Sequence, residues 1–328
     1  MSADADSSAP QAAQEPAPHA AESTRYKYYT LDVFTDRAFG GNPLAVLPDA
    51  RGLSTEQMQR ITAEFNLSET VFVLPPDDPT HARKLRIFTP GRELPFAGHP
   101  TVGTAFLLAA LGMIDVAEGE AHIVLEEGVG PVAVTLSVEG GVPMFATLTT
   151  AQAPELRRDV PRVADVAEML TLDISDIGAP GFTIAAVSCG IPFLLVPLRS
   201  RQCVSRAKLR REAWENVLSS AWAREIFLFD GSAIERRTPI RARMFAPSLG
   251  IGEDPATGSA AAALAAYLAM RNDSANARLD WVVEQGVEMG RPSVLRLSAD
   301  IDHGAVSAVR VGGQSVLVSE GMMTVPAA

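Results

Sequence analysis

Cysteine and metal-ligand patterns are nearly absent from this chain. Its 328 residues contain two cysteines, Cys189 and Cys203, which is too few for a disulfide scaffold or a cysteine zinc site. The five histidines show no metal-ligand spacing, and no phosphate-binding P-loop motif occurs. We therefore expect no metal and no cofactor. A reaction in this protein would use oxygen and imidazole groups, which points to proton transfer.

Long apolar runs and a basic leader are also lacking. No apolar run approaches the roughly 18 residues that a membrane-spanning helix needs. Residues 1–24 contain no Lys or Arg and no apolar segment, so they indicate a disordered tail and not a signal peptide. The formal net charge of −11 disfavours nucleic acid and membrane surfaces as partners. We expect a cytoplasmic protein that binds a small anionic substrate in a local positive pocket.

An internal echo organises the chain that remains. Residues 86–90 (Arg-Ile-Phe-Thr-Pro) precede a small-residue helix starting near Gly98, and residues 243–247 (Arg-Met-Phe-Ala-Pro) precede an Ala-rich helix starting near Gly258. Two copies are too few for a solenoid, so the echo favours a duplicated domain. We expect an N-terminal domain over 25–150 and a C-terminal domain over 151–328. The final strands of the second domain could pack with the N-terminal domain.

Strand patterns are short, frequent and bounded by Gly, Pro or Asp. This pattern favours antiparallel or mixed sheets over a parallel series of strand–helix–strand units. A helix start exposes unpaired N–H groups and the positive end of the helix dipole. If the two halves face each other, two such starts point at one cleft. We expect the N–H groups of Gly98 and Gly258, with Ser259, to hold a carboxylate there.

Three side chains are candidates for the chemistry. Glu69 begins an apolar strand, where burial would raise its pKa and suit it to general acid/base work; the alternative is an exposed glutamate at a strand edge. His99 could move a proton or bind the substrate, with its pKa lowered by the helix end; the alternative is a packed, capping histidine. Asp254 could accept from a substrate amine or hydroxyl or carry a second proton; the alternative is a helix cap.

Several blocks of the sequence carry most of its recognisable motifs: residues 32–35, 41–46, 66–70, 93–101 and 252–260, with 309–313 near the end. In order and spacing, these blocks resemble the signature blocks of the PhzF family of phenazine-biosynthesis isomerases. The resemblance implies an α+β, diaminopimelate-epimerase-like fold: two pseudo-symmetric domains, each with a mixed or antiparallel sheet around a central helix. It also implies a homodimer and isomerisation of dihydro-hydroxyanthranilate without a cofactor.

The same resemblance assigns roles to particular residues. The family's acid/base glutamate falls on Glu69. Its other active-site residues fall on Ser68, Gly98, His99, Asp254, Gly258 and Ser259. The related epimerases and proline racemases carry a cysteine pair at the helix starts, where this chain has Ala97 and Thr257, so two-thiol racemisation is not expected.

The leading hypothesis is a cofactor-independent isomerase in which Glu69 moves a proton within a small unsaturated carboxylic acid. Two alternatives stay open at this stage. One is an isomerase or epimerase acting on a different small metabolite. The other is a catalytically silent binding or interaction protein on the same fold.

Overall fold

The computed structural model describes residues 23–327, so most of the tail expected over 1–24 lies outside the described residues. Ser23 and Thr24, which that tail was expected to include, are the first residues of strand β1 (Ser23–Val33). Within the described part of the chain, no helix is long and apolar enough to cross a membrane.

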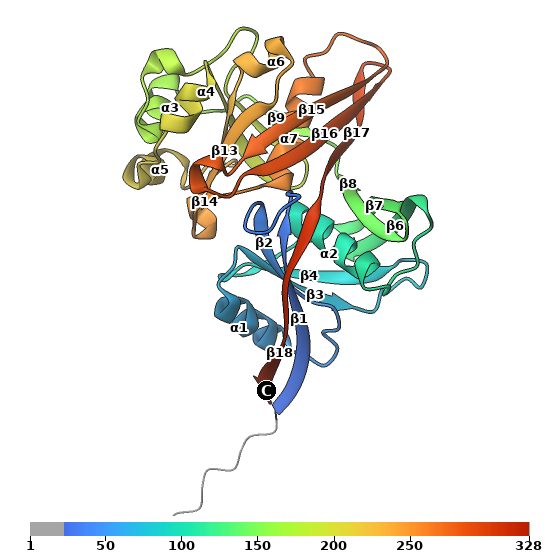
Figure 1. Cartoon of the computed structure of the whole chain (residues 1–328). Helices are drawn as coiled ribbons and strands as arrows, with labels where there is room; N and C mark the ends of the chain where they lie inside the picture. The colour runs from blue at the N-terminus through green and yellow to red at the C-terminus, as the bar shows by residue number, and fades with distance from the viewer. Residues whose placement is uncertain (1–22, 328) are drawn as a thin grey trace, which may run out of the picture.

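The first half of the molecule, residues 23–149, wraps a curved sheet around helix α2 (Gly98–Ala110) (Figure 1). Eleven of the 13 residues of α2 are buried, because a helix of small and apolar residues on all sides can only be stable inside a core. Helix α1 (Thr55–Phe65) begins with a capping box of Ser54 and Gln57. The strands after β1 are β2 (Asn42–Leu47), β3 (Glu69–Leu74), β4 (Arg83–Phe88), β5 (Glu93–Leu94), β6 (Gly119–Glu127), β7 (Gly130–Glu139) and β8 (Val142–Thr149).

The second half, residues 155–313, repeats this plan around helix α7 (Gly258–Ala269), of whose 12 residues 11 are buried. Its strands are β9 (Glu155–Arg157), β10 (Ala185–Ser188), β11 (Pro192–Leu198), β12 (Glu225–Asp230), β13 (Ile240–Ala246), β14 (Ile251–Asp254), β15 (Ala277–Gln285), β16 (Ser293–Asp302) and β17 (Ala305–Gly313). Its other helices are α3 (Val163–Leu170), α4 (Arg201–Arg206), α5 (Arg211–Leu218) and α6 (Ser232–Arg236), with single 3₁₀ turns at Ile174–Asp176, Pro247–Leu249 and Val287–Met289.

The pairing of strands is the same in the two halves. β2 and β3 are parallel, as are β11 and β12; β3–β4 and β12–β13 are antiparallel; and β4–β6 and β13–β15 are parallel. Each half then closes with a three-stranded antiparallel meander, β6–β7–β8 or β15–β16–β17. This repeat of mixed sheets around two central helices confirms the expected α+β, diaminopimelate-epimerase-like fold.

Two strand pairs join the halves. β8 pairs with β17 in antiparallel register, from Arg310 opposite Thr149 to Gly313 opposite Ala146. The last strand, β18 (Ser315–Pro326), then runs down along β1, so the described ends of the chain lie together at the bottom of the molecule (Figure 1). The crossing-back of the last strand is therefore present, while the domain boundary at residue 150 stays a prediction.

Candidate active site

The two central helices meet at their N-terminal glycines. A Cβ on Gly98 would lie 2.8 Å from the Gly258 Cα and 2.9 Å from the Ser259 nitrogen, and a Cβ on Gly258 would lie 3.0 Å from the Gly98 Cα. Only glycine at both positions allows this backbone contact. The positive ends of two helix dipoles thus converge at one place, which favours a bound anion.

Glu69 and His99 face each other beside this contact. Glu69 is the first residue of β3, and its parallel partner in β2 is Leu44. His99 is the second residue of α2. The Glu69 Oε2 and His99 Nε2 atoms are 3.5 Å apart, both are buried, and neither has a hydrogen-bond partner within the described residues. Two unpaired polar atoms buried side by side are costly, which is typical of a site that acts on a ligand.

Glu69 is 8% exposed and His99 is 3% exposed. The alternative of an exposed strand-edge glutamate is therefore wrong. The alternative for His99, a packed histidine that caps its helix, is correct in the packing but wrong in the cap. His99 lies inside α2, and the N-cap residue Ala97 makes no side-chain cap.

Asp254 comes from the second half and is tied to the first half by Asn42. The Asn42 amide donates to Asp254 Oδ1 at 2.9 Å and to the Ala256 carbonyl at 2.9 Å. The Ser68 hydroxyl donates to the Asn42 side-chain oxygen at 3.0 Å. Asn42 therefore joins one carboxylate to the strand that carries Glu69.

The interpretation of Asp254 as a cap of helix α7 is corrected by its contacts. It ends β14, three residues before the N-cap residue Thr257, and accepts from the Thr257 hydroxyl at 2.5 Å. No side-chain cap bond reaches the α7 backbone from Thr257. Gln285 supports this loop by accepting from the Thr257 N–H at 3.1 Å and donating to the Asp254 carbonyl at 2.8 Å.

Burial separates the protonation states of the three groups. Desolvation, with the charge of Asp254 as the second cause, raises the pKa of Glu69 to about 8 against a lowering by the Ser68 bond. Desolvation raises the pKa of Asp254 to about 6, although the bonds from Thr257 and Asn42 oppose the shift. Desolvation lowers the pKa of His99 to about 3. At neutral pH the site holds a protonated Glu69, a neutral imidazole and a mostly ionised Asp254.

The structure brings Ser68, Gly98 and Gly258 to this centre through the contacts above. Ser259 is the second residue of α7 and is half-buried, and its expected role in holding a carboxylate stays a prediction. The sequence patterns assign no role to Asn42 or Gln285. Asn42 could have been suspected from its place in a Gly-Asn-Pro turn leading into a buried strand, whereas Gln285 carries no local signal.

The N-cap positions of the two central helices are Ala97 and Thr257, neither of which carries a thiol. Both cysteines lie elsewhere and are buried. Burial raises the pKa of Cys189 to about 12, so that sulfur stays a thiol and a poor nucleophile. Two-thiol proton transfer therefore has no place at this site.

The Arg-x-Phe echo has a structural role in each half. Arg86 makes a bidentate ion pair with Glu93 of β5, both contacts at 2.7 Å, and Arg243 makes one with Glu253 of β14 at 2.7 and 2.8 Å. Each guanidinium also lies about 5 Å from the ring of the phenylalanine two residues on. The arginine thus fixes the short return strand that leads to each central helix.

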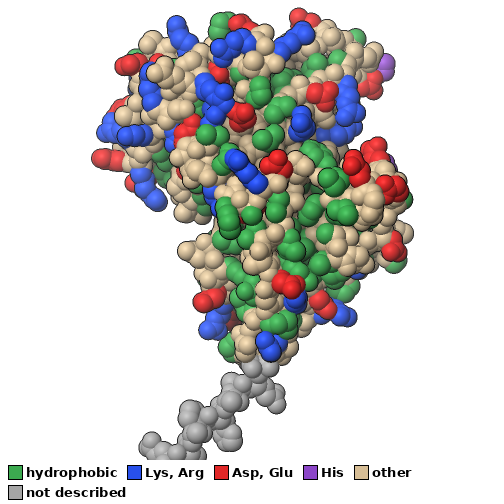
Figure 2. Space-filling view, viewed as in Figure 1, with side chains coloured by type: hydrophobic (Ala, Val, Ile, Leu, Met, Phe, Trp, Pro, Cys, Tyr) green, Lys and Arg blue, Asp and Glu red, His purple; other side chains and the backbone are tan. Residues whose placement is uncertain are grey.

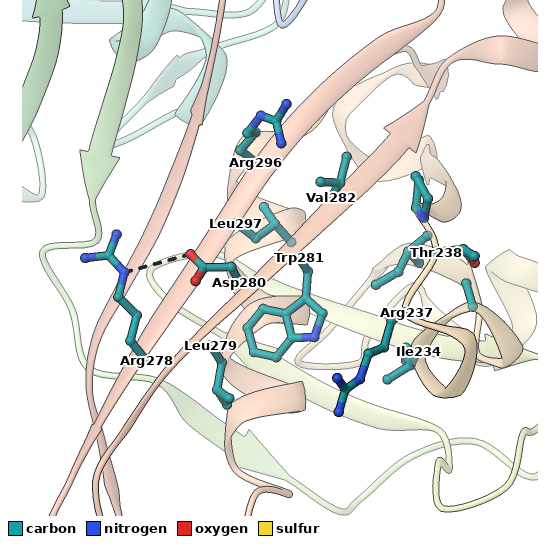
Figure 3. A pocket seen from close by; sticks show the side chains of 13 residues that line it. Ile234, Arg237, Thr238, Arg278, Leu279, Asp280, Trp281, Val282, Arg296 and Leu297 are labelled. Atoms are coloured by element: carbon teal, nitrogen blue, oxygen red, sulfur yellow. Dashed lines mark ion pairs between the residues drawn. The ribbon is translucent and has the colours of Figure 1, made fainter.

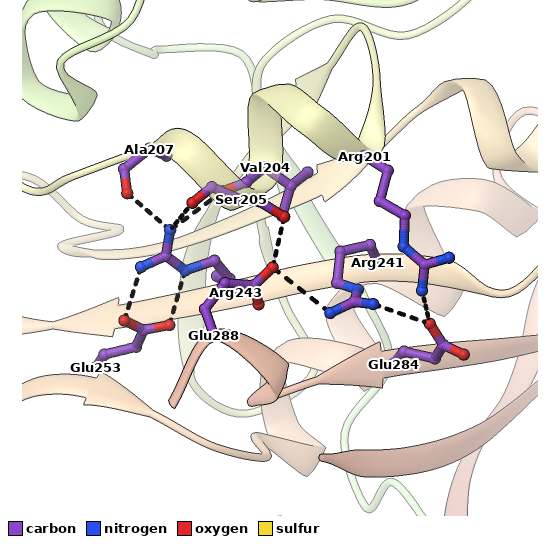
Figure 4. A network of polar contacts seen from close by, with 9 residues as sticks. All are labelled: Arg201, Val204, Ser205, Ala207, Arg241, Arg243, Glu253, Glu284 and Glu288. Carbon is purple, nitrogen blue, oxygen red and sulfur yellow. Dashed lines mark hydrogen bonds and ion pairs between the residues drawn. The ribbon is translucent and has the colours of Figure 1, made fainter. Parts of the chain in front are cut away.

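The second copy of this device has further supports (Figure 4). Arg243 Nη1 donates to three carbonyls around α4, those of Val204, Ser205 and Ala207. Glu253 precedes Asp254 in β14, so this buried network holds the strand that presents the catalytic candidate.

A separate hollow of about 750 Å³ lies against β15 and β16 of the second half (Figure 3). Arg237, Arg296 and Trp281 line it, and its carboxylate Asp280 is exposed and 3.8 Å from Arg278. Because this carboxylate is exposed to solvent and paired with Arg278, the hollow presents no buried carboxyl group of the kind found beside the two helix starts. The centre between the two helices is therefore the candidate active site.

Other solved structures share this fold of two pseudo-symmetric halves, each built around a central helix. A hydroxyproline epimerase of Agrobacterium vitis has the same fold, with a TM-score of 0.64 at 12% identity over 92% of each chain. At that identity the likeness concerns the fold alone.

The chain belongs to the phenazine biosynthesis-like family (PhzC-PhzF), whose model matches residues 31–321. It is 39% identical over 299 residues to an uncharacterized isomerase of Mesorhizobium japonicum, covering 90% of this chain and 98% of the relative. It is 37% identical over 300 residues to the trans-2,3-dihydro-3-hydroxyanthranilate isomerase of Pseudomonas chlororaphis, with the same coverage.

A solved structure gives the same result. The phenazine biosynthesis protein of the PhzF family from Bacillus anthracis superposes with a TM-score of 0.80 at 25% identity, covering 92% of this chain and 99% of that one. The protein is therefore an isomerase of the PhzF family.

Proposed function

We propose that this isomerase moves one proton within a small unsaturated carboxylic acid of the dihydro-hydroxyanthranilate type, with Glu69 as the acid/base and no cofactor. The observation that carries the proposal is the pair of buried, unpartnered atoms Glu69 Oε2 and His99 Nε2, 3.5 Å apart, at the meeting point of two helix N-termini. The substrate class comes from the similar isomerase of Pseudomonas chlororaphis.

The contacts of the Asn42 amide favour one tautomer of His99. Both amide hydrogens are already used at 2.9 Å, by Asp254 and by the Ala256 carbonyl. The contact of 3.3 Å from this amide to His99 Nδ1 is then only a close approach. Nδ1 can therefore carry the imidazole hydrogen, which leaves Nε2, unpaired within the described residues, with a lone pair.

This arrangement suits a shuttle of one proton. In its ionised form, Glu69 takes a proton from a carbon next to the substrate's unsaturation. The double bond then shifts, and Glu69 returns the proton to the carbon at the other end of the shifted system. One C–H bond breaks and one forms, so no oxidant or reductant is needed. A pKa near 8 makes the carboxylate a stronger base than an ordinary glutamate and keeps the transferred proton on the enzyme between the two steps.

The neighbouring groups would bind and orient the substrate. The N–H groups of Gly98 and Gly258, with Ser259, hold its carboxylate at the two positive helix ends. His99 Nε2 and Asp254 accept from its amine or hydroxyl. Because Glu69, His99 and Asp254 are all nearly inaccessible, the two halves must separate for the substrate to enter and close again before the chemistry.

Incubation with trans-2,3-dihydro-3-hydroxyanthranilate in D₂O tests the proposal. We expect the double bond to shift without any change in oxidation level. Any deuterium that enters the product from D₂O should be found by NMR only at the carbon that gains hydrogen. Absence of both turnover and deuterium uptake would exclude this substrate class for the protein.

A second candidate function is the same proton shift on a different small unsaturated acid. It is favoured by the 39% identity to a relative named only as an uncharacterized isomerase, which exceeds the 37% identity to the isomerase with a named substrate. A panel of unsaturated amino and hydroxy acids, screened by NMR in D₂O for a shifted double bond and for deuterium uptake, separates the two candidates. Either change in a panel member, in the absence of turnover of dihydro-hydroxyanthranilate, would favour the second.

We also propose that the protein is a homodimer. Leu317 and Met322 of β18 are 48% and 45% exposed, and Figure 2 shows apolar side chains gathered on the lower part of the molecule, where β18 and β1 run. Apolar patches of this kind mark interaction surfaces. We expect light scattering to give twice the mass of the chain at micromolar concentration, and the Leu317→Glu change to lower it. A wild-type monomer would contradict the proposal.

A further inference from the structure

Glu127 is a buried acid near the candidate site to which the proton transfer above gives no role. It is the last residue of β6 and is 8% exposed. Its Oε1 atom lies 2.6 Å from the hydroxyl oxygen of Thr101 in the first turn of α2, two residues after His99. The backbone of Ala97, the residue before α2, also acts on the Glu127 carboxyl group by lowering its pKa.

The hydroxyl of Thr101 has two short contacts but only one hydrogen. One contact joins it to Glu127 Oε1 at 2.6 Å and the other to the Ala97 carbonyl oxygen at 2.7 Å. A carbonyl can only accept, so Thr101 donates to Ala97. The 2.6 Å contact is then a hydrogen bond only if Glu127 is the donor, which requires a protonated carboxyl group.

The other oxygen of Glu127 supports the same protonation state. Oε2 is buried and has no hydrogen-bond partner within the described residues. An unpaired carbonyl-type oxygen costs far less in the interior than an unpaired ionised carboxylate does. Burial raises the pKa of Glu127 to about 8, against lowering by Thr101 and Ala97.

The second half carries an amide at the equivalent position. Gln285 is the last residue of β15, as Glu127 is of β6. Leu125 of β6 pairs with Arg83 and Val283 of β15 pairs with Ile240, in each case two residues before that end. Gln285 accepts from the N–H of Thr257, the N-cap of α7, and donates to the Thr257 hydroxyl at 3.0 Å. A neutral group that both donates and accepts therefore supports the start of each central helix.

The charged groups around Glu127 are paired with one another. They line a hollow in front of its strand and come from β4, β5, the β3–β4 connection and β6 itself. The pairs are Arg86 with Glu93, Lys84 with Asp77, and His81 with Glu126. Asp78 accepts a hydrogen bond from the Thr80 hydroxyl. No basic side chain within the described residues is in ion-pair contact with Glu127, so none of these cations compensates its ionised form.

We propose that Glu127 is a positioning residue that acts as a carboxylic acid, donating to Thr101 so that the first turn of α2 holds His99 in place for the proton transfer. The proposal rests on the proposed function for its catalytic consequence. Ionisation of Glu127 would remove its O–H donor. The single hydroxyl hydrogen of Thr101 could then satisfy either Ala97 or Glu127 but not both, and the turn that carries His99 would become less rigid.

The Glu127→Gln variant tests this, because an amide donates and accepts like the protonated acid. We expect its kcat to match that of wild type near pH 7. Above pH 8 the wild type ionises at Glu127 and loses activity, so the variant should be about tenfold more active at pH 9.5. Glu120→Gln, the same change at an exposed position of β6, is the matched control and should follow the wild-type profile. Identical alkaline profiles for wild type and Glu127→Gln would overturn the positioning role.

Thermal unfolding provides a readout that needs no substrate. The folded pKa of Glu127 lies above its ordinary value of 4.5, so the folded state holds a proton that the unfolded chain releases. Stability from this group is therefore complete below about pH 4.5 and is lost as pH rises towards 8. We expect the Tm of Glu127→Gln, measured relative to that of wild type, to increase as the pH is raised from 5 to 9.

The same variant separates failure of this inference from failure of the proposed function. If no substrate turns over, the NMR resonances of the His99 imidazole still report on its position. Titration of Glu69, which lies 3.5 Å from the ring and has a pKa of about 8, would move them in both proteins, so both are compared in a Glu69→Gln background. There we expect the resonances to move above pH 8 when Glu127 is present and not in Glu127→Gln. A constant Tm difference between the two proteins, or imidazole resonances that move alike in both, would overturn the inference whatever the substrate.

Discussion

Replacing Glu69 by glutamine should lower kcat by about 10²–10⁴-fold, the range that a general acid/base contributes. Glutamine has the same shape but no proton to shuttle, and the group is protonated and neutral in the resting site, so the fold should tolerate the change. The measurement is kcat on dihydro-hydroxyanthranilate or on the active member of the panel, together with deuterium uptake from D₂O. Wild-type turnover by Glu69→Gln would remove Glu69 from its role.

The internal repeat supplies a matched control for this variant. Glu225 is the first residue of β12, as Glu69 is of β3, and it is buried with a raised pKa caused first by desolvation. Its parallel partner in β11 is Phe193, as that of Glu69 in β2 is Leu44. The histidine of α2 has no counterpart in α7, where Ser259 follows Gly258. We expect Glu225→Gln to keep most of the wild-type kcat, and an equal loss in both variants would point to a general effect of buried glutamates.

Replacing Gly98 by alanine should lower kcat by about 10²-fold, because displacements of about 1 Å at reacting groups have effects of that size. The added Cβ would lie within 2.9 Å of three backbone atoms of Gly258 and Ser259. These atoms belong to the backbone at the start of α7 in the other half. Unlike the end of a long side chain, they cannot move aside without a shift of the helix. The halves would then close to a larger separation, and the Asn42 contacts to Asp254 and Ala256 would lengthen.

Gly91→Ala is the control for this substitution. Gly91 lies in the β4–β5 turn, where an added Cβ would meet nothing within 4 Å and the φ angle is not positive, so the kcat of this variant should match that of wild type. The Tm of Gly98→Ala should fall modestly, since overpacking costs about 1–3 kcal/mol. Wild-type kcat in Gly98→Ala would show that the two helix starts need not touch during catalysis.

Local sequence patterns predict much of the architecture. The Arg-x-Phe-x-Pro echo, followed in each copy by a helix of small residues, indicates the duplication. In the structure, Arg86 and Arg243 each pair with a glutamate and lie against a phenylalanine ring. The capping box of Ser54 and Gln57 at the start of α1 is a local feature of the same kind. These features depend on residues within a few positions of one another, which is why a single sequence contains them.

The site is predictable in part. The pattern places Glu69 at the start of an apolar strand, and its burial follows from that strand's position between β2 and β4. The pattern also places Asp254 at a helix start as a site candidate. The alternative of a helix cap is wrong, because Asp254 accepts from the Thr257 hydroxyl and the Asn42 amide and from no helix N–H among the described residues. The carboxylate-holding role of Ser259 is still a prediction.

The sequence by itself determined the repeat and the fold class, and it named the candidate acid/base residues. Only the tertiary structure decided which polar groups support them. Asn42 meets Asp254 across 212 positions of the chain, and Glu127 and Gln285 reach the two helix starts from the far ends of separate strands. Such contacts, and the protonation states that burial imposes on them, arise from how two halves pack together, and no local pattern of residues encodes that packing.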